Sequence, residues 1–391
     1  MDNSLLKELA AARRRRESER GEQSPKRPRV AGDQASNASN DNEVIDLMAS
    51  DDEAPPEDDA AMAARLQREE ELDASAALAA RLQGEELLRG AAEVVTHGPY
   101  AYPAARRREL VAAGARVNGL NVRCGSSGWQ HGPRWSLYPP GTAREQQLEV
   151  YARTMGAVEV NGTYYHMQPA AVLRKWRRAA EAAPGHFGFA LKVNKYFTHT
   201  KRLIVDDAFR GRWERDLTVF AELGDTCLVL LVSLPASFKR TPANLTRVRD
   251  LAALCRARDG FDPFFAVEFK HPSWFAGEVY DAIAASARLS LVSSHGYGPG
   301  SDLAPGAWYP PNHADALRCA HGKCFYTRLH GTIGESQGDY GEHHLLPLCD
   351  RLRQHSAGGG GLSFVGLNNV GGEPPSAVVD AATIAARLNG P

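Results

Sequence analysis

One twelve-residue stretch, FFAVEFKHPSWF at 264–275, joins a strand suited to burial with groups that can do chemistry. Its first four residues are those of a strand enclosed on both faces. Glu268, Lys270 and His271 follow at once, where a core would exclude charge. A carboxylate, an ammonium and an imidazole in this position predict a site that transfers protons or binds an anion.

Charged and polar residues also follow other apolar runs of the chain. Those that we single out are Ser127 and Trp129; Glu159, Asn161 and Tyr164; Lys192 and Asn194; His295; Arg328 and His330; and Asn368 and Asn369. Glu159 and Glu268 could divide the roles of acid and base, or could bind a divalent metal ion together with histidines. Lys192 and Arg328 supply the positive charge that an anionic substrate requires, and either could neutralise a buried carboxylate at Glu268.

These residues act together only if the fold brings strand ends together, and the chain alternates as such a fold requires. Eight apolar runs follow residue 120, at 121–129, 157–165, 187–194, 226–235, 264–272, 289–295, 323–331 and 362–370. Segments of helical period lie between most of them, at 143–155, 170–183, 206–223, 242–258, 275–287 and 342–355, and a last one follows at 374–388. We expect the Pro- and Gly-rich segment 296–322 to be a loop. The alternation predicts an α/β fold, a closed (β/α)8 TIM barrel, with a doubly wound open sheet as the competing interpretation.

In such a barrel the carboxyl ends of the strands and the loops after them form the active face. The residues that we predict to be catalytic are Glu159, Lys192, Glu268, His271, Arg328 and His330, and those predicted to bind substrate are Trp129, Asn161, Tyr164, Trp274, Asn368, Gly371 and Gly372. Trp274 is expected to form a lip for a flat or apolar part of the substrate. Gly371 and Gly372 precede a helix, whose free N–H groups would bind phosphate.

The motifs GSSGW, VEVNGTYY, ALKVNKYFTH, EFKHPSWF, YTRLHG and NNVGG occur in this order between residues 121 and 388. Together they resemble the motif string of the YecE-like family, domain of unknown function 72, which implies a TIM-barrel-like fold. The resemblance implies functional positions at Ser127, Gly128, Trp129, Glu159, Asn161, Tyr164, Lys192, His199, Glu268, His271, Pro272, Trp274, Arg328, His330, Gly331 and Asn368. Val370 stands where the family often has an acid, so a role that needs that carboxylate is not expected here.

Composition separates this barrel from an N-terminal tail. We divide the chain into a disordered tail at 1–60, helices at 61–90, a linker at 91–120 with a short helix, and the barrel at 121–391. Residues 41–90 carry 4 Lys or Arg against 15 Asp or Glu, whereas residues 91–391 have a net charge of +7. The clusters RRRR at 13–16 and PKRPRV at 25–30 resemble a nuclear localisation signal.

Two further motifs of the tail resemble binding sites for small modifier proteins. EVIDLMASDDE at 43–53 resembles a SUMO-interacting motif, in which Val44, Ile45 and Leu47 would add a strand to the edge of the SUMO sheet. MAARLQREE at 62–70 recurs as LAARLQGEE at 78–86 and resembles a tandem pair of inverted ubiquitin-interacting helices. The ubiquitin-binding residues would be Met62, Ala63, Leu66, Leu78, Ala79 and Leu82.

No run of 18 apolar residues occurs, so no membrane-spanning helix or membrane partner is expected, and the basic N-terminus lacks the apolar run of a secretory signal. The six cysteines indicate reduced thiols. CAHGKC at 319–324 lacks a second Cys/His pair of the usual zinc-site spacing, so we expect no metal there.

We therefore expect a nuclear protein whose barrel is an enzyme, with hydrolysis as the candidate reaction. Its substrate would bear phosphate, with nucleic acid in a DNA damage response as the favoured case. The tail would recruit it to SUMO- or ubiquitin-marked assemblies. Two alternatives stay open, which are a small-molecule barrel enzyme with a regulatory tail and a non-catalytic binding platform. A divalent metal ion is the one cofactor that the residues suggest.

Overall fold

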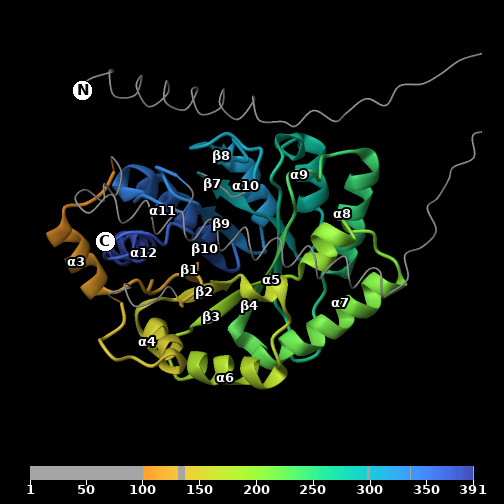
Figure 1. The fold of residues 1–391 in the computed structure, drawn as a ribbon. Coiled ribbons are helices and arrows are strands. Elements are labelled where there is room, and N and C mark those ends of the chain that lie inside the picture. The colour runs from red at the N-terminus through yellow and green to blue at the C-terminus, as the bar shows by residue number, and fades with distance from the viewer. Residues whose placement is uncertain (1–99, 131–136, 297–299, 335, 391) are drawn as a thin grey trace, which may run out of the picture. The chain divides into compact units, whose positions relative to one another are not determined.

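A computed structural model describes residues 100–130, 137–296, 300–334 and 336–390 (Figure 1). These residues lie within one compact unit of the chain. The basic clusters, the SUMO-interacting motif and the ubiquitin-interacting repeat all lie outside the described residues. Within the described part, no helix is both long and apolar enough to cross a bilayer.

The centre of the fold is a curled, mostly parallel sheet of ten strands, barrel-like in form. The strands are β1 (Val122–Ser127), β2 (Ala157–Val160), β3 (Gly188–Lys192), β4 (Cys227–Ser233), β5 (Phe264–Glu268), β6 (Leu289–Leu291), β7 (Ser293–His295), β8 (Trp308–Tyr309), β9 (Phe325–Leu329) and β10 (Ser363–Leu367). Their order is β6-β5-β4-β3-β2-β1-β10-β9-β7-β8. Among the described strands, β7 and β8 pair in the antiparallel direction, and the other neighbouring strands pair in parallel. All eight predicted runs therefore contain strands of one sheet.

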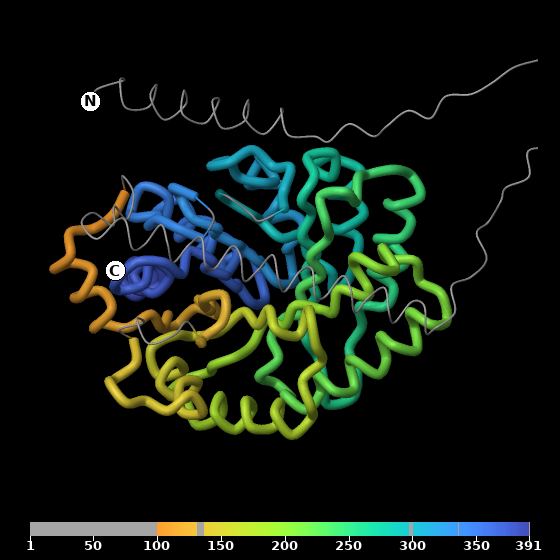
Figure 2. Tube along the Cα trace, viewed as in Figure 1, coloured from red at the N-terminus to blue at the C-terminus, as the bar shows by residue number. Residues whose placement is uncertain are grey.

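Helices lie outside the sheet, and the C-terminal helix packs beside the first helix of the described part (Figures 1 and 2). They are α3 (Ala104–Ala113), α4 (Gln147–Thr154), α5 (Gly162–Tyr165), α6 (Ala170–Glu181), α7 (Asp207–Phe220), α8 (Pro242–Leu254), α9 (Gly277–Ala284), α10 (His313–Ala320), α11 (Gly341–Ala357) and α12 (Ser376–Asn389). Side-chain caps define where several helices begin. The Asp206 side chain accepts a hydrogen bond from the Phe209 N–H at the start of α7, and the Thr241 side chain accepts one from the Asn244 N–H at the start of α8.

Two separate clusters of buried residues hold the sheet in place. The larger cluster fills the space between the strands and the helices, with Trp213 and Phe265 stacked at its centre. The smaller cluster lies on the concave side of the strands and consists of Ala157, Ala190, Val229, Leu231, Ala266, Val292, Cys324, Tyr326, Leu362 and Phe364. Side chains alternate along a strand, so a parallel strand with a buried residue on each face reads as continuously apolar.

The segment 296–322, predicted as a loop, is only partly one. It contains β8 and the helix α10, so the loop prediction is wrong for 313–320. The Asn312 side chain caps α10 by accepting a hydrogen bond from the Ala314 N–H. The helix buries Ala316, Cys319 and Ala320, which are small residues with a weak apolar signal, and its Pro- and Gly-rich neighbours hid the pattern.

The segment interpreted as a linker contributes a packed helix. The expected short helix is α3, which buries Leu110 and Arg107 and contacts α12. The Arg107 guanidinium forms an ion pair with Asp339 and donates a hydrogen bond to the Pro374 carbonyl. Both charged side chains are almost completely buried, so this contact ties α3 to the loop after β9 and to the start of α12.

Replacing Arg107 by Met tests whether α3 belongs to the folded unit. The change leaves the Asp339 carboxylate buried without its cation, which typically costs about 3–5 kcal/mol. We expect a large fall in the unfolding free energy measured with urea. The matched control is Arg106→Met on the same helix, because Arg106 and Glu109 form an exposed pair. Equal effects of the two substitutions would contradict the packing role.

Candidate active site

The candidate site begins two residues beyond the apolar floor of the sheet's concave side. Ala157, Ala190, Ala266 and Tyr326 belong to the buried floor. Two positions further along the same four strands stand Glu159, Lys192, Glu268 and Arg328. Because strand residues two apart share a face, these four side chains rise from the floor at the carboxyl ends of their strands. The sheet thus changes from apolar to charged within one step of its pleat.

Arg328 is the centre of this charged layer. Its Nη2 and Nε donate to Glu159 Oε1 and Oε2 at 2.7 and 2.9 Å. Its Nη1 donates to Glu268 Oε1 at 2.6 Å. One guanidinium therefore neutralises both carboxylates, with a two-pronged contact to the first and a single contact to the second. The expected pairing of Glu268 with a cation is confirmed, with Arg328 as the partner.

Hydroxyl groups complete the environment of the two carboxylates. Tyr326 donates to Glu159 Oε2 at 2.7 Å, and Ser233 donates to Glu268 Oε2 at 2.6 Å. A side chain at Gly366 would place its Cβ 3.0 Å from Glu159 Oε2, so β10 needs glycine where the carboxylate lies. Each acid is thus held rigidly by partners from neighbouring strands.

The pKa values of these groups follow from burial and pairing. Burial, the largest single influence, would raise the pKa of Glu159 and of Glu268, but the charge of Arg328 together with hydrogen bonds to the carboxylates outweighs it. The pKa of Glu159 therefore lies below its usual value, and that of Glu268 lies well below. Burial would also lower the pKa of Arg328, but the two glutamates raise it well above its usual value. All three side chains are charged at neutral pH.

His330 extends the charged layer by one more position on β9. Its Nε2 lies 3.5 Å from Glu268 Oε1. Burial, together with the charge of Arg328, lowers the pKa of His330 despite its hydrogen bond with Glu268. The imidazole is therefore neutral at pH 7 and could accept a proton from a ligand.

Lys192 lies apart from this ion-pair system, against an aromatic ring. Its Nζ is 4.3 Å from the centroid of the Tyr164 ring. Burial, and then repulsion by Arg328 and Lys270, lowers its pKa to about 8. The Tyr164 hydroxyl is 3.1 Å from both ring nitrogens of His199, whose pKa burial and the nearby lysines lower to about 4. Tyr164 thus links the ammonium to a neutral histidine.

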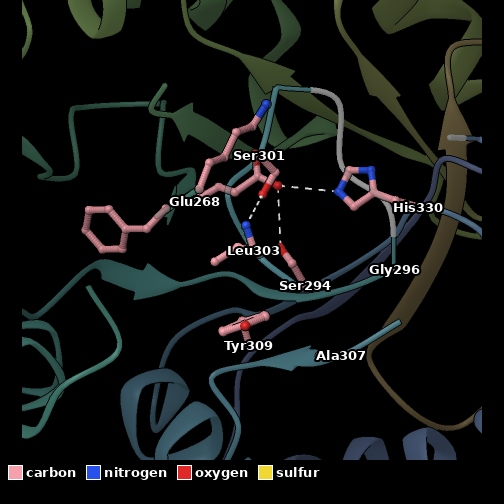
Figure 3. Close-up of a pocket in the computed structure, with 10 residues that line it drawn as sticks. Glu268, Ser294, Gly296, Ser301, Leu303, Ala307, Tyr309 and His330 are labelled. Carbon is pink, nitrogen blue, oxygen red and sulfur yellow. Dashed lines mark hydrogen bonds and ion pairs between the residues drawn. The ribbon is translucent and has the colours of Figure 1, made fainter. Parts of the chain in front are cut away.

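A shallow recess lies beside Glu268 (Figure 3). Ser294 and His330 reach the Glu268 carboxylate from one wall, as the dashed lines in Figure 3 indicate. Lys270, Ser301 and Tyr309 line other parts of it. The segment between β7 and α10, not predicted to contribute, therefore covers one side of the site.

Two predicted site residues take structural positions instead. Trp274, expected as an exposed lip, is fully buried and stacks on Phe269 with ring centroids 4.2 Å apart. The apolar residues around it hold the indole in the core, so that prediction is wrong. His271 Nδ1 accepts a hydrogen bond from the Ser273 N–H and caps a short 3-10 turn. His271 stands three positions beyond Glu268, the last residue of β5, and so lies in the loop after the strand.

The remaining predicted substrate-binding residues divide between free and engaged groups. Asn161 Nδ2 donates to Ser127 Oγ at 2.5 Å and lies 3.4 Å from Glu159 Oε1. Asn368 is buried, and its Nδ2 has no hydrogen-bond partner within the described residues. It stands two positions after Gly366 and one residue beyond the end of β10, so by the alternation of the strand we place it on the same side as the glutamates. Its amide is a donor available to a ligand.

Trp129, Gly371 and Gly372 are less accessible to a ligand than expected. Trp129 is buried and contacts Trp176 edge to face, with ring centroids 5.1 Å apart. The Gly371 N–H donates to the Ser336 carbonyl at 3.4 Å, and Gly372 adopts a φ of 91°. The helix α12 starts only at Ser376. The pair therefore shapes a turn before the helix, and the amide of Gly371 is already used.

Metal-binding groups are not gathered at this site. The described residues contain no cluster of three or more His, Cys, Asp or Glu side chains that could hold a metal ion. Glu159 and Glu268 both direct oxygens to Arg328, a cation that occupies the place between them. Cys319 and Cys324 of the CAHGKC segment are buried free thiols.

Sequence reasoning missed the hydroxyl partners Ser233, Ser294 and Tyr326. A signal for Tyr326 was present, because it stands two positions before Arg328 on the same strand and must share its face. The serines have no comparable signal. A serine at a strand end is common, and only the register of β4 and β7 against β5 and β9 brings these two to Glu268.

The fold and this site define a barrel-like α/β protein whose candidate active face lies at the carboxyl ends of parallel strands. Residues 123–390 match the family model described as Protein of unknown function DUF72, and the chain belongs to that family. The resemblance drawn from the motifs is thereby confirmed.

Individual relatives agree with this family. UPF0759 protein YunF of Bacillus subtilis is 29% identical over 180 residues, which are 45% of this chain and 58% of that protein. The chain thus matches somewhat more than half the length of that relative. A DUF72 family protein of Thermotoga maritima is 22% identical, with a TM-score of 0.52 over 68% of this chain and 98% of the other. One from Enterococcus faecalis is 16% identical, also with a TM-score of 0.52, over 68% and 95%. These structures support the fold.

Replacing Arg328 by Met tests the central ion pairs. It leaves two buried carboxylates without a cation, so we expect a loss of about 3–5 kcal/mol of unfolding free energy at pH 7. In the native protein the depressed pKa values of Glu159 and Glu268 stabilise the fold above about pH 4, and this contribution disappears as the pH falls through the folded pKa values. In the variant the unpaired acids have raised pKa values, so its stability should rise between pH 7 and pH 5.

Urea unfolding at pH 5 and pH 7 measures both effects. The control is Arg174→Met, which removes an exposed ion pair with Glu222 and should change little at either pH. A variant of Arg328 whose stability does not rise between pH 7 and pH 5 would contradict this account of the site.

Proposed function

We propose that the barrel mouth is the active site of an enzyme that acts on a small, phosphate-bearing substrate. The observation that carries this proposal is the distribution of charge. Arg328 forms ion pairs with both Glu159 and Glu268, whereas Lys192 has no acidic partner within the described residues. The Lys192 ammonium is therefore a cation that a ligand anion in the mouth could contact directly.

Two further features support a ligand at this place. The buried Asn368 amide has an unused donor on the same side of the sheet. The recess beside Glu268 provides a place at the surface of the mouth for part of such a ligand. Glu268 and His330, which line the recess, are both able to accept a proton from a ligand at neutral pH.

We favour a small substrate over nucleic acid, the class first expected, because Glu159, Glu268 and Arg328 are buried side chains that an intact duplex could not reach. Nucleic acid stays the second candidate because residues 91–391 have a net charge of +7. The proposal also includes closure of the sheet as a (β/α)8 barrel. β6 pairs with β5, and β7 pairs with β9. Only Val292 lies between β6 and β7 in the chain, and its side chain belongs to the smaller cluster on the concave side.

Calorimetry with inorganic pyrophosphate tests the anion site. We expect binding that weakens at least ~10-fold in Lys192→Met, because one charge-assisted contact is lost. Binding should also decline as the pH rises through about 8, since the Lys192 ammonium loses its proton there. The control Lys175→Met changes an exposed lysine of α6 and should bind normally.

The same calorimetric titration distinguishes the two substrate classes. A short DNA duplex that binds more tightly than pyrophosphate, with a steep dependence on salt, would favour nucleic acid. The anion site would be contradicted if neither ligand bound, or if pyrophosphate bound equally well to the native protein and to Lys192→Met.

We also propose that the tail recruits the protein to SUMO- or ubiquitin-marked assemblies in the nucleus, as in a DNA damage response. The motif at 43–53 and the 16-residue repeat support this. Replacing Val44, Ile45 and Leu47 together by Ala should abolish a pull-down with SUMO without changing the melting temperature. Ala63→Asp with Ala79→Asp should weaken polyubiquitin binding more than monoubiquitin binding, because avidity is lost. If the triple Ala variant still captured SUMO, the SUMO-interacting motif would be contradicted. If the double Asp variant lost polyubiquitin and monoubiquitin binding equally, the tandem ubiquitin-interacting helices would be contradicted.

A further inference from the structure

Lys192 has the environment of a nucleophilic amine. It ends β3 on the concave side of the sheet and is partly exposed, so a ligand in the mouth can reach it. Its Nζ rests 4.3 Å from the Tyr164 ring centroid, and no acid within the described residues pairs with it. A lysine kept for a structural ion pair would have a carboxylate at hydrogen-bond distance.

The charged groups around Lys192 favour the neutral amine. Burial disfavours its positive charge most, and Arg328 from β9 and Lys270 after β5 add to this effect by repulsion. Glu159 and Glu268 attract the charge, but both are engaged by Arg328. The balance leaves the pKa of Lys192 at about 8, with a substantial neutral fraction at physiological pH.

We propose that the Lys192 amine attacks the carbonyl carbon of an aldehyde or ketone that carries a phosphate or carboxylate group, and forms an imine with it. This deepens the proposed function and rests on it, since it names the reactive group of the anionic substrate. The geometry that points to it is the solvent-accessible, unpaired amine at a strand end, held against an aromatic face and beside two cations.

The covalent step balances without any oxidant or reductant. The Nζ lone pair forms a bond to the carbonyl carbon, and the electron pair of the C=O double bond moves to oxygen. Transfer of a proton from nitrogen to that oxygen gives a neutral carbinolamine. A further proton delivered to the hydroxyl lets it leave as water while the nitrogen lone pair forms the C=N bond, and the proton still on nitrogen is released for a neutral imine. Hydrolysis reverses the sequence and restores the amine.

A chain of hydroxyl and imidazole groups next to Lys192 can move these protons. Thr198 Oγ1 is 2.8 Å from His199 Nδ1, and His199 in turn contacts the Tyr164 hydroxyl at 3.1 Å. The His199 imidazole is neutral at pH 7, so one nitrogen donates a hydrogen bond while the other accepts one. Tyr164, whose ring face contacts the Lys192 Nζ, thus brings this chain of groups to the neighbourhood of the amine.

Pyridoxal 5′-phosphate, an aldehyde with a phosphate group, serves as the probe for the full-length protein. Treatment with borohydride reduces any imine to a stable secondary amine, and peptide mass spectrometry then locates it. At pH 8 an amine with a pKa of about 8 is half neutral, against less than about 1% for an ordinary lysine. We expect labelling at Lys192 at least ~10-fold faster than at the exposed Lys175, with a midpoint near pH 8.

Two variants and a second ligand separate the outcomes. Lys192→Arg keeps the positive charge but cannot form the imine, and Lys192→Met removes both. Pyridoxine 5′-phosphate, which lacks the aldehyde, reports anion binding alone. Loss of the fast labelling in both variants, with pyridoxine phosphate still bound by Lys192→Arg, supports the inference. If either variant fails to fold, the site and pH profile of labelling in the native protein decide the question.

Contrary results fall into two distinguishable kinds. Labelling of the native protein at exposed lysines only, while pyridoxine phosphate still binds in the mouth, overturns the imine and leaves the proposed function standing. Failure of both the labelling and the phosphate binding overturns the two proposals together.

Discussion

The pairing of one buried guanidinium with two carboxylates governs the arrangement of this barrel mouth. Arg328 reaches Glu159 on one side and Glu268 on the other, and the contacts measure 2.6–2.9 Å. Because an unpaired charge at this depth would be very costly, the three strands that carry these residues must keep their register. The constraint also fixes the chemistry, since it commits both acids to a cation and leaves Lys192 outside the pairing.

The concave side of the sheet accommodates this system through small residues. Ala157, Ala190 and Ala266 form a floor of short side chains, and Gly366 leaves space against Glu159. Larger residues at these positions would displace the charged layer. The polar ends of the strands therefore depend on the apolar positions two residues before them, which links the packing of the interior directly to the geometry of the site.

The family motifs and the alternation of runs were sufficient to predict the strands, most helices and four of the residues that meet at the mouth: Glu159, Glu268, Arg328 and His330. The reason is that parallel strands end at one edge of a sheet, so polar residues at their ends converge whatever the details of the loops. This reasoning does not apply to Trp274 and His271. They follow a strand rather than end it, and packing against Phe269 and capping of the next turn decided their positions.

The sequence by itself determined that an apolar residue and a charged residue two positions later share one face on the four strands that carry the site, because side chains alternate between the two faces of a strand. It also determined the family, through motifs that read in order along the chain. Only the tertiary structure decided which cation pairs with which acid, since register and strand order place Arg328 between two glutamates 109 positions apart in the chain. It likewise decided that Lys192 faces an aromatic ring instead of a carboxylate, a contact between β3 and α5 that no local pattern encodes.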